Sequence, residues 1–580
     1  MHIERLDAEI PVGEAIVWAL ADAGVRYVLT LPGGYVGPIL DALHDHPTIR
    51  TVQVREESIG TAMAEAYGRL TGEPIAVLGQ GQWISGVAGA GLLESLLGSS
   101  PVLVLTEMTD GGPFSHHGNF QAGDGEYGTW DARTALSGIS KSVMTSRFPA
   151  QAVQHVQLGL KHALSGEPGP AVVIFHGSSL KGTVGPATRP RIYGSRPYLV
   201  RPRHSVDELA LADAVDALTR AQSPVVIAGN GVRVAQATTS LARLSAALDV
   251  PVMTSAGGKG VFDETDPRAA GMIGMNGLAS AHDLLSAADL ILAVGTKLAP
   301  NDTLREHPDL IDPTRQVLIQ VDVEPLNASW TYPVHHVLEG DAGFVMDRIS
   351  DAFETPPTRP VSATERIVRA RSAWHEFDLA TFESDTVPFR PERIIRTLEE
   401  SVTDDAIITL DAGENRLFMM HWFRNRRPGG YLQPAGSGQM AYSIRAAMGA
   451  KLAFPDAPAI AVCGDGGFSM NLHSLLSSVQ EKLPVAVVIF NNSSLSWVVH
   501  AMGDRAVAGD LMDVDYAAVA RSLGCDGVRP ASVGELRTAL EKASGPLERT
   551  FVIDVPTSME TTFKDVEVRS LLKRQETSRA

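Results

Sequence analysis

An acidic glycine turn and a pair of asparagines are the residues of this chain whose spacing best suits chemistry. The turn Gly464-Asp465-Gly466-Gly467 follows the apolar run 459–463, and Asn491-Asn492 closes the apolar run 485–490. Each run is typical of a buried parallel strand. Carboxylate, amide and backbone carbonyl oxygens are hard ligands that suit Mg²⁺ or Ca²⁺, and a metal held by few protein groups usually takes phosphate oxygens as well.

The two polar strand ends are expected to lie together. Neighbouring parallel strands place their carboxyl ends at one edge of a sheet, where open α/β folds bind ligands. Asp465 should therefore face Asn492, and the amides of Gly466 and Gly467 can receive the same anion at the start of a helix. A lone Gly-Asp-Gly would indicate only an ordinary βαβ unit. With Asn-Asn at this distance, the pattern resembles the thiamine diphosphate motif and predicts a cofactor site.

Length and composition predict a large globular protein. The 580 residues suggest about three domains, and 44% hydrophobic with 20% charged residues indicates buried cores rather than disorder. A net charge of -18 argues against nucleic acid as a partner. Two cysteines imply no disulfide framework and fit a reducing cytoplasm. No apolar core of a signal peptide and no run of transmembrane length is evident, so no membrane partner is expected.

The first block, residues 1–185, alternates strand and helix patterns. A helix is expected over 13–23 and strands over 25–31, 75–78, 102–105 and 171–175. The turn Pro32-Gly33-Gly34 follows the first of these strands, and a short strand over 53–57 leads into a helix over 58–70. Such alternation indicates a parallel sheet covered by helices. The segment 177–202, rich in Gly, Pro, Ser and Arg, is interpreted as a linker.

Two further α/β blocks follow. Residues 200–355 contain expected strands at 224–228, 251–254, 290–294 and 317–321, with turns at Gly229-Asn230-Gly231 and Gly295-Thr296-Lys297. These turns could accept a nucleotide diphosphate, although any doubly wound sheet requires similar turns. Residues 370–565 contain a strand over 406–410, a helix over 442–452 and the acidic turn, with a helix after it marked by Phe468, Leu472, Leu475, Leu476 and Val479. The tail 566–580 is expected to be a frayed end or a lid.

With these blocks in order, the chain resembles the thiamine diphosphate enzymes of the acetolactate synthase, pyruvate oxidase and pyruvate decarboxylase group. Its pattern is most similar to the catalytic large subunit of acetolactate synthase. The resemblance extends over nearly the whole chain, and its specific motifs lie in the first and third blocks. It implies an α/β fold of three doubly wound parallel-sheet domains: pyrimidine-binding (1–185), central (200–355) and diphosphate-binding (370–565).

The resemblance assigns the activating carboxyl to Glu57. Arg55-Glu56-Glu57, followed by Ala64-Glu65-Ala66-Tyr67-Gly68-Arg69, is similar to the segment around the family's catalytic glutamate, and counting back from Tyr67 selects Glu57 rather than Glu56. The cofactor activates its own C2–H once N1′ of its pyrimidine is protonated or strongly hydrogen-bonded. That requires a carboxyl group in a dry site, where burial raises its pKa. The alternative is an exposed glutamate at a helix start, stabilised by the helix dipole.

Further cofactor contacts are implied in the third block. Gly438-Gln439-Met440 resembles the segment that seats the aminopyrimidine, with the Gly438 carbonyl accepting from the 4′-amino group and Met440 wedged between the rings. A methionine beside a helix is otherwise core filler. Asn415 and Arg416 fall where the family contacts the diphosphate, beside an uncharacteristic Glu414. The complete implied cofactor set is Gly34, Asn415, Arg416, Gly438, Met440, Gly464, Asp465, Gly466, Gly467, Asn492 and Trp497.

The resemblance gives Mg²⁺ three ligands: Asp465, Asn492 and the main-chain oxygen of Ser494. On the substrate side, Phe120-Gln121 is similar to the Phe-Gln pair of acetolactate synthase, which makes Gln121 a candidate catalytic residue. His116 and His117 instead resemble the pair with which pyruvate decarboxylase handles protons, and imidazole suits that task near neutral pH. The alternative for both is a surface loop.

Some positions depart from the family pattern. The expected Gly-Pro-Gly is replaced by Gly79-Gln80-Gly81-Gln82-Trp83, so that Gln80 or Trp83 is expected to reshape the pocket. Trp497 would line the pocket mouth in place of a smaller residue. Lys297 stands where flavin-binding relatives often carry arginine.

The resemblance implies a thiamine diphosphate- and Mg²⁺-dependent lyase or transferase. It would decarboxylate a 2-oxo acid and ligate the product to a second carbonyl, as acetolactate synthase does. The central domain would hold FAD, ADP or no nucleotide. An active homodimer or homotetramer is implied, because in this family neighbouring subunits supply the two halves of each site.

Several alternatives stay open. The chain could release an aldehyde, cleave a 2-hydroxyacyl-CoA with ADP in the central domain, or oxidise pyruvate with FAD. From another class, it could be a non-catalytic partner subunit, although Glu57, Asp465 and Asn492 are all present. The sequence does not identify the donor or acceptor substrate.

Overall fold

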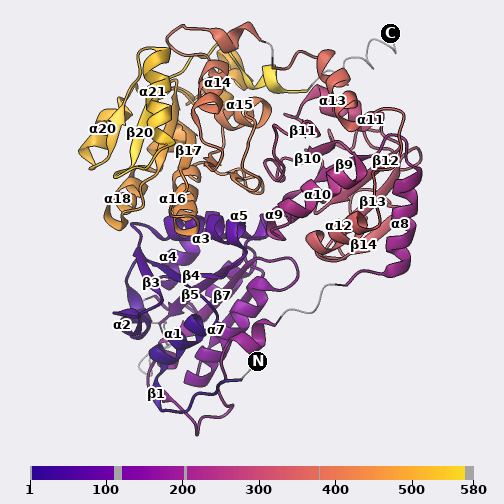
Figure 1. The fold of residues 1–580 in the computed structure, drawn as a ribbon. Helices are drawn as coiled ribbons and strands as arrows, with labels where there is room; N and C mark the ends of the chain where they lie inside the picture. The colour runs from indigo at the N-terminus through magenta and orange to yellow at the C-terminus, as the bar shows by residue number, and fades with distance from the viewer. Residues whose placement is uncertain (1–2, 110–120, 201–204, 378, 569–580) are drawn as a thin grey trace. The chain divides into compact units, whose positions relative to one another are not determined.

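The computed structural model describes residues 3–109, 121–200, 205–377 and 379–568. The chain divides into two compact units, and Figure 1 follows it from end to end. Unit 1 comprises Met1–Pro202 with Met448–Pro455 and Leu472–Leu483. Unit 2 comprises Arg203–Ala447, Asp456–Asn471 and Pro484–Ala580. No helix among the described residues is long and apolar enough to cross a membrane.

Unit 1 is built on a six-stranded parallel sheet. In spatial order its strands are β3 (Arg50–Gln53), β2 (Tyr27–Thr30), β4 (Ile75–Leu78), β5 (Val102–Met108), β7 (Pro170–His176) and β6 (Ser142–Ser146). The inner strands β4 and β5 are buried along their whole length, as a parallel sheet covered on both faces requires. The chain adds β3 on one side of β2 and then returns to add β4 on the other, so the strand order reverses between β2 and β4.

Helices cover both faces of this sheet. Helices α1 (Val12–Asp22), α2 (Gly37–Leu43) and α7 (Pro149–Leu164) lie on one face, and α3 (Glu57–Thr71) and α5 (Gly89–Leu97) on the other (Figure 1). The short helices α4 (Gly81–Gly86) and α6 (Ala132–Ser137) follow strand ends. Helix α3 is buried from Glu57 to Leu70 and ends at Gly72, whose left-handed φ of 66° forms the cap.

Part of the segment interpreted as a linker is packed. Within residues 177–200, strand β8 (Thr183–Val184) pairs antiparallel with β1 (Ile10–Pro11), and the side chain of Ile192 is buried. The richness in Gly and Pro reflects short turns between these contacts.

Unit 2 contains two more six-stranded parallel sheets. The first has the order β11 (Ala269–Met272), β10 (Val252–Thr254), β9 (Val225–Ala228), β12 (Leu290–Val294), β13 (Val317–Asp322) and β14 (His336–Glu339). One face packs on α8 (Glu208–Arg220), α10 (Thr238–Leu248) and α12 (Ala342–Asp351), and the other on α11 (Ala279–Ser286) and α13 (Ala363–Ser372). A short helix, α9 (Asn230–Val234), follows β9.

The second sheet of unit 2 carries the acidic turn. Its order is β16 (Tyr431–Leu432), β15 (Ile407–Leu410), β17 (Ala459–Gly464), β18 (Ala486–Asn491), β20 (Phe551–Pro556) and β19 (Asp526–Val528). Helices α14 (Pro391–Ser401), α15 (Glu414–Trp422) and α21 (Val533–Ala543) share one hydrophobic core with it. Helices α17 (Asp465–Ser469), α19 (Ser496–Met502) and α20 (Tyr516–Ser522) also belong to unit 2. Helix α18 (Leu472–Glu481) belongs to unit 1, and the boundary between the units falls within α16 (Ser443–Ala453). All three sheets confirm the predicted α/β fold.

The helix expected after the acidic turn is two helices, α17 and α18. The apolar spacing identified α18 as helical but did not identify its buried face. Leu476 is 37% and Val479 38% exposed, whereas Ser477 and Ser478 are buried. Serine occupies the buried face because Ser477 Oγ accepts a hydrogen bond from the backbone amide of Arg55 at 3.1 Å and Ser478 Oγ donates to Leu483 O at 2.7 Å.

Candidate active site

Within unit 2, candidate site residues follow the carboxyl ends of β15 and β17. These strands are parallel neighbours, with Leu410 opposite Val462. After β15 the chain forms β16 on one side and then returns to form β17 on the other. Open α/β sheets bind ligands at such reversals of strand order. Asp411 and Asp465, the residues that follow these strands, therefore stand where a ligand is expected.

Asp465 lies in a nest of backbone amides. Its side chain is buried, with an exposed fraction of 2%. Oδ1 accepts from Gly466 N at 2.8 Å and Oδ2 from Ser494 N at 3.2 Å, and the amides of Asn492 and Ser493 also face it. Burial raises the pKa of Asp465, while these amides lower it. The structure thus brings the loop after β18 onto the end of β17, as the sequence predicts.

The two asparagines at the end of β18 have different environments. Asn491 points into the fold, where its Nδ2 donates to Asp554 Oδ1 at 2.8 Å and to Val514 O at 3.1 Å. Asn492 Oδ1 is buried and has no hydrogen-bond partner within residues 3–109, 121–200, 205–377 and 379–568. A buried oxygen without a partner beside a buried carboxylate is a donor set that fits a divalent cation.

Hydrogen bonds to Gly509 and Leu511 fix the loop that carries Asn492. Ser494 Oγ donates to Gly509 O at 3.2 Å, and Leu495 N donates to the same oxygen at 2.7 Å. Leu511 N donates to Ser493 O at 2.8 Å. In the described part of the chain, no group of three or more His, Cys, Asp and Glu side chains could hold a metal. The predicted metal site has a different composition, because it combines one carboxylate with one side-chain amide oxygen and one backbone oxygen.

Two glycines of the acidic turn, Gly466 and Gly467, leave no room for a side chain. A Cβ on Gly466 would lie 2.7 Å from Leu495 Cδ2 and 3.3 Å from Met440 Cε. A Cβ on Gly467 would lie 2.3 Å from Asp411 Oδ2. Met440, the predicted wedge, therefore contacts the same turn as the predicted metal ligand.

Asp411 is a site residue that sequence reasoning did not single out. Its carboxylate accepts from three successive amides: Ala441 N at 2.9 Å, Tyr442 N at 2.7 Å and Ser443 N at 2.5 Å. It is fully buried, and burial raises its pKa against the effect of these amides. Asp411 thereby fixes the end of the segment that carries Gly438 and Met440. Its position directly after a buried strand was the available signal.

Of the other predicted cofactor residues in unit 2, Asn415 lies beside this turn and Arg416 contacts the segment before Gly438. Asn415 Nδ2 donates to Asp411 O at 3.3 Å, and its Oδ1 lies 3.7 Å from where a Cβ on Gly464 would stand. Arg416 Nη1 donates to Pro434 O at 3.0 Å, four residues before Gly438, which has a positive φ of 64°.

Trp497 lies on α19, directly after the predicted metal loop. Its side chain is 40% exposed, and its ring centroid is 5.9 Å from that of Phe563 in a short 3₁₀ helix, Phe563–Val566. The ring of Trp497 is large and partly exposed. Its predicted position at the mouth of the pocket stays a proposal.

Unit 1 carries its own group of candidate residues, at the point where the order of its sheet reverses. Glu57 begins α3, and only 4% of its surface is exposed. Burial raises the pKa of Glu57, and the neighbouring charge of Glu56 adds to the increase. A Cβ on Gly79, just after β4, would lie 3.3 Å from Glu57 Cγ. The structure therefore excludes the alternative of an exposed glutamate at a helix start.

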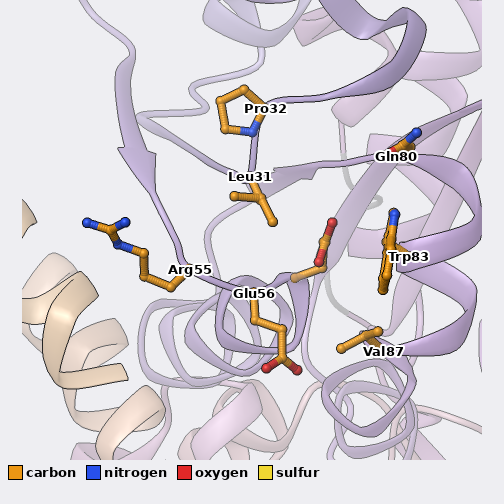
Figure 2. A pocket seen from close by; sticks show the side chains of 8 residues that line it. Leu31, Pro32, Arg55, Glu56, Gln80, Trp83 and Val87 are labelled. Atoms are coloured by element: carbon orange, nitrogen blue, oxygen red, sulfur yellow. The ribbon is translucent and has the colours of Figure 1, made fainter. Parts of the chain in front are cut away.

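A pocket of about 490 Å³ opens beside Glu57. It is lined by Leu31, Pro32, Arg55, Glu56, Glu57, Gln80, Trp83 and Val87 (Figure 2). Leu31 and Pro32 follow β2, and Gln80 follows β4, so the pocket occupies the reversal of strand order. Gln80 and Trp83, the departures from the family pattern, both line it.

The two adjacent glutamates of this pocket, Glu56 and Glu57, differ in their contacts and in their burial. Glu56 accepts from Ser58 Oγ at 2.6 Å and lies 2.7 Å from His473 Nε2. Figure 2 shows its side chain directed away from Gln80. Glu57 is the more buried of the two, in agreement with the selection made from Tyr67.

Gln121 is joined to this pocket through Gln80. Gln80 Nε2 donates to Gln121 Oε1 at 2.5 Å, and Gln121 has a left-handed φ of 62°. Gly34, the predicted cofactor glycine of unit 1, also has a positive φ of 66°. The candidates His116 and His117 lie outside the described residues.

The glycine turns of the central sheet contact each other. Gly229 N donates to Val294 O and Gly231 N to Gly295 O, both at 2.9 Å. A Cβ on Gly229 would lie 2.2 Å from Gly295 O. The amides of these two glycines therefore donate to backbone oxygens of the central sheet and its turns. Nucleotide binding in the central domain stays a prediction.

Comparison with known proteins agrees with this geometry. Three family models match in order: the N-terminal (residues 10–124), central (211–349) and C-terminal (411–555) domains of thiamine pyrophosphate enzymes. The chain is 26% identical to the acetolactate synthase large subunit of Haemophilus influenzae over 557 residues, which cover 93% of each chain. It is 28% identical to acetolactate synthase isozyme 3 large subunit of Escherichia coli, covering 91% of each.

A third relative carries a less specific name. The YdaP protein of Bacillus subtilis, whose name describes it as thiamine pyrophosphate-containing, is 26% identical over 553 residues, 94% of this chain and 91% of its own. The three domains in order, with acetolactate synthases among the relatives that span almost the whole chain, decide the family. The chain belongs to the thiamine pyrophosphate (thiamine diphosphate) enzymes and is an acetolactate synthase-like member that makes or breaks C–C bonds.

Proposed function

We propose that this enzyme decarboxylates a 2-oxo acid and joins the remaining fragment to a second carbonyl compound, with Mg²⁺ anchoring its cofactor. Bound thiamine diphosphate supplies the nucleophilic carbon and accepts the electrons that decarboxylation releases. The single observation that carries the proposal is the buried carboxyl of Glu57 in the wall of a 490 Å³ pocket.

Glu57 holds a proton at N1′ of the cofactor's pyrimidine. Burial favours the neutral acid, and a neutral carboxyl can share its proton with a ring nitrogen. The adjoining Leu31, Pro32 and Val87 give the wall an apolar character that limits water. Exclusion of water protects the reactive fragment from a proton until the second carbonyl arrives.

The end of β17 holds the anionic part of the cofactor. Asp465, Asn492 and the Ser494 main-chain oxygen would hold Mg²⁺, which would neutralise the charge of the diphosphate. The buried, unpartnered Oδ1 of Asn492 supports this assignment. Gly466 and Gly467 let the backbone approach the anion closely, and Asn415 and Arg416 add donors beside it.

The substrate side is assigned to Gln121, with His116 and His117 as candidate proton carriers. Gln121 reaches the pocket through its hydrogen bond with Gln80. Trp497, at the end of the metal loop, borders the site of the second carbonyl. The volume of the pocket and the side chain of Trp83 limit which donor acid can bind. We include acids bulkier than pyruvate among the candidates.

Product analysis tests the proposal. The purified enzyme, with thiamine diphosphate and Mg²⁺, would be incubated with pyruvate, 2-oxobutyrate and phenylglyoxylate, singly and in pairs. A 2-hydroxy-ketone or 2-hydroxy-2-alkyl-3-oxo acid is the expected product. Aldehyde as the sole product would remove the ligation step, and hydrogen peroxide with a yellow protein would indicate FAD-dependent oxidation instead.

We further propose a homodimer or homotetramer whose sites combine Glu57 of one subunit with the metal loop of its neighbour. FAD or ADP is the candidate occupant of the central domain. Mass spectrometry of the small molecules released from the purified protein would distinguish FAD, ADP and neither. Cys463 and Cys525 are both buried and unpaired, which fits the cytoplasmic location that we propose.

A further inference from the structure

A second buried carboxyl, Glu107, stands at the same edge of the unit 1 sheet as Glu57. It is the sixth residue of β5, next to the strand whose end carries Gly79 and Gln80. Gly79 N donates to Leu105 O at 3.1 Å, and Thr106 Oγ1 donates to Gly79 O at 2.9 Å. The backbone around Gln80 is thus fixed against the end of β5.

The environment of Glu107 is unusual for a structural residue. Its exposed fraction is 2%. The amides of Tyr35 and Gly81 face the carboxyl, but neither oxygen has a hydrogen-bond partner among the described residues. A buried carboxyl without a partner destabilises a fold. Its presence at a strand end beside a pocket therefore points to a use other than stability.

Glu107 and Gln80 meet at Gly34. A Cβ on Gly34 would lie 2.2 Å from Glu107 Oε1 and 3.1 Å from Gln80 Cγ. A Cβ on Gly33 would lie 3.3 Å from Gln80 Oε1. The Glu107 carboxyl and the Gln80 side chain are therefore neighbours at Gly34, and Gln80 also lines the Glu57 pocket, whereas Glu107 does not.

The amide of Gln80 links this carboxyl to the substrate side. Gln80 Nε2 donates to Gln121 Oε1 at 2.5 Å, so the two amides form one unit on the pocket wall. An amide has two donors and one acceptor oxygen, and a carboxyl can accept or, when protonated, donate. Burial raises the pKa of Glu107, which favours the protonated form.

We propose that Glu107 is a positioning residue for substrate binding. As the neighbour of Gln80 at Gly34, it keeps the Gln80–Gln121 amide pair in place, and these amides bind the carboxylate or carbonyl oxygen of the 2-oxo acid. Glu107 acts through Gln80 and does not touch the substrate. The inference rests on the proposed function, because it assigns the substrate contacts of that reaction.

A double-mutant cycle tests this coupling. The enzymes compared are the parent, Glu107→Gln, Gln80→Leu and the double variant, with Glu107→Leu as a second truncation of the carboxyl. KM and kcat would be measured with pyruvate, or with the 2-oxo acid that the parent turns over fastest. Calorimetry would give Kd for methyl acetylphosphonate, which cannot lose CO₂, and thermal unfolding of the cofactor-free proteins would give Tm.

We expect Glu107→Gln to raise KM and Kd about tenfold, because a displaced Gln80–Gln121 pair would make one hydrogen bond fewer to the substrate. The change in kcat should be much smaller, and Tm should stay the same or rise because an unpartnered buried carboxyl is removed. In the Gln80→Leu background, Glu107→Gln should have no further effect on KM. Glu73→Gln, the same change at a surface carboxyl that accepts from Tyr67, should match the parent.

Three results would overturn the inference. The first is an unchanged KM and Kd in both Glu107 variants. The second is an equal rise of KM with and without Gln80, which would show that Glu107 does not act through Gln80. The third is a fall in Tm in parallel with activity in both variants, the mark of a structural role. A parent enzyme inactive on every 2-oxo acid would defeat the proposed function itself, whereas an active parent with silent variants defeats only this inference.

Discussion

The backbone amide of Ser494 donates a hydrogen bond to Asp465 Oδ2 at 3.2 Å. This bond joins the loops that follow two neighbouring parallel strands, β17 and β18. It turns the main chain of the β18 loop toward the carboxylate of the acidic turn. The Asp465 carboxylate and the loop that carries Asn492 and Ser494 therefore lie together in the fold.

The difference between the two adjacent asparagines gives a matched pair of variants. Asn492→Ala removes an oxygen that has no partner in the described chain, and it should leave Tm near that of the parent. Retention of thiamine diphosphate in the presence of Mg²⁺ should fall at least tenfold, because the metal loses a protein ligand. Equilibrium dialysis at fixed Mg²⁺ measures this affinity.

Asn491→Ala should behave in the opposite way. Its side chain donates to Asp554 and Val514, so its loss leaves a buried carboxylate short of a partner. The expected cost is about 1–3 kcal/mol of unfolding free energy, with cofactor affinity changed much less. If both variants released cofactor equally, Asn492 would have no special place at the metal.

Asp411 was not among the predicted site residues, but we expect its substitution to lower both stability and cofactor affinity. Asp411→Asn replaces one of the acceptor oxygens facing Ala441, Tyr442 and Ser443 with an NH₂ group. We expect a loss of about 2–4 kcal/mol of unfolding free energy and at least a tenfold weaker binding of thiamine diphosphate, since the Gly438–Met440 segment loses its support. Urea unfolding and fluorescence titration measure the two effects.

The exposed Asp404 provides the control for that change. Its carboxylate is 83% exposed and pairs with Arg426 at 3.2 Å. Asp404→Asn should change neither stability nor cofactor affinity appreciably, because exposed ion pairs contribute little. Cofactor affinity unaltered in Asp411→Asn would mean that the turn is held by other contacts.

The raised pKa of Glu57 predicts a pH-dependent stability difference. A carboxyl with a higher pKa in the folded than in the unfolded state binds its proton more tightly when folded. Its contribution to stability is complete below the unfolded pKa and is lost as pH rises through the folded pKa. Glu57→Gln cannot titrate, so its Tm relative to the parent should increase from pH 4 toward neutrality. A Tm difference that is constant with pH would contradict the burial of an ionisable group here.

Mixing two inactive variants tests the subunit arrangement. Co-expressed Glu57→Gln and Asp465→Ala chains form some mixed dimers. If each site takes Glu57 from one subunit and Asp465 from its partner, one site in every mixed dimer is intact. Random pairing then restores about a quarter of the parental activity. Each variant expressed alone should be inactive, and a mixture that stays inactive would place both residues in the same subunit's site.

The sequence predicted most of the inner strands and the acidic turn well because these features depend on local composition. The continuous apolar runs of β4, β12 and β17 need no tertiary information to be recognised as buried strands. The inner strand β20 was not predicted, and of the edge strands only β3 was, with an expected range of 53–57 instead of Arg50–Gln53. β6, with the sequence Ser-Val-Met-Thr-Ser, and β14, with an exposed Val337, have one side without a neighbour and lack an apolar run.

The parts of the site that were missed depend on tertiary contacts. The roles of Asp411 and Glu107 follow from which amides and glycines lie opposite them, and neither belongs to a local pattern. The buried serine face of α18 was missed for the same reason, because Ser477 is buried by the backbone of Arg55, more than 400 positions away. The choice of Glu57 over Glu56 as the activating carboxyl rests on a count from Tyr67 and stays a prediction, and the structure adds that Glu57 is buried.

The most direct test of the central claim is the exchange rate of the C2 proton of enzyme-bound thiamine diphosphate in D₂O. The rate would be measured by acid quench and proton NMR in the parent, in Glu57→Gln and in the neighbouring control Glu56→Gln. The account predicts fast exchange in the parent and in Glu56→Gln, and exchange slower by about 10²–10⁴-fold in Glu57→Gln, with the cofactor still bound. Equal exchange rates in Glu57→Gln and the parent would contradict the role of this buried carboxyl.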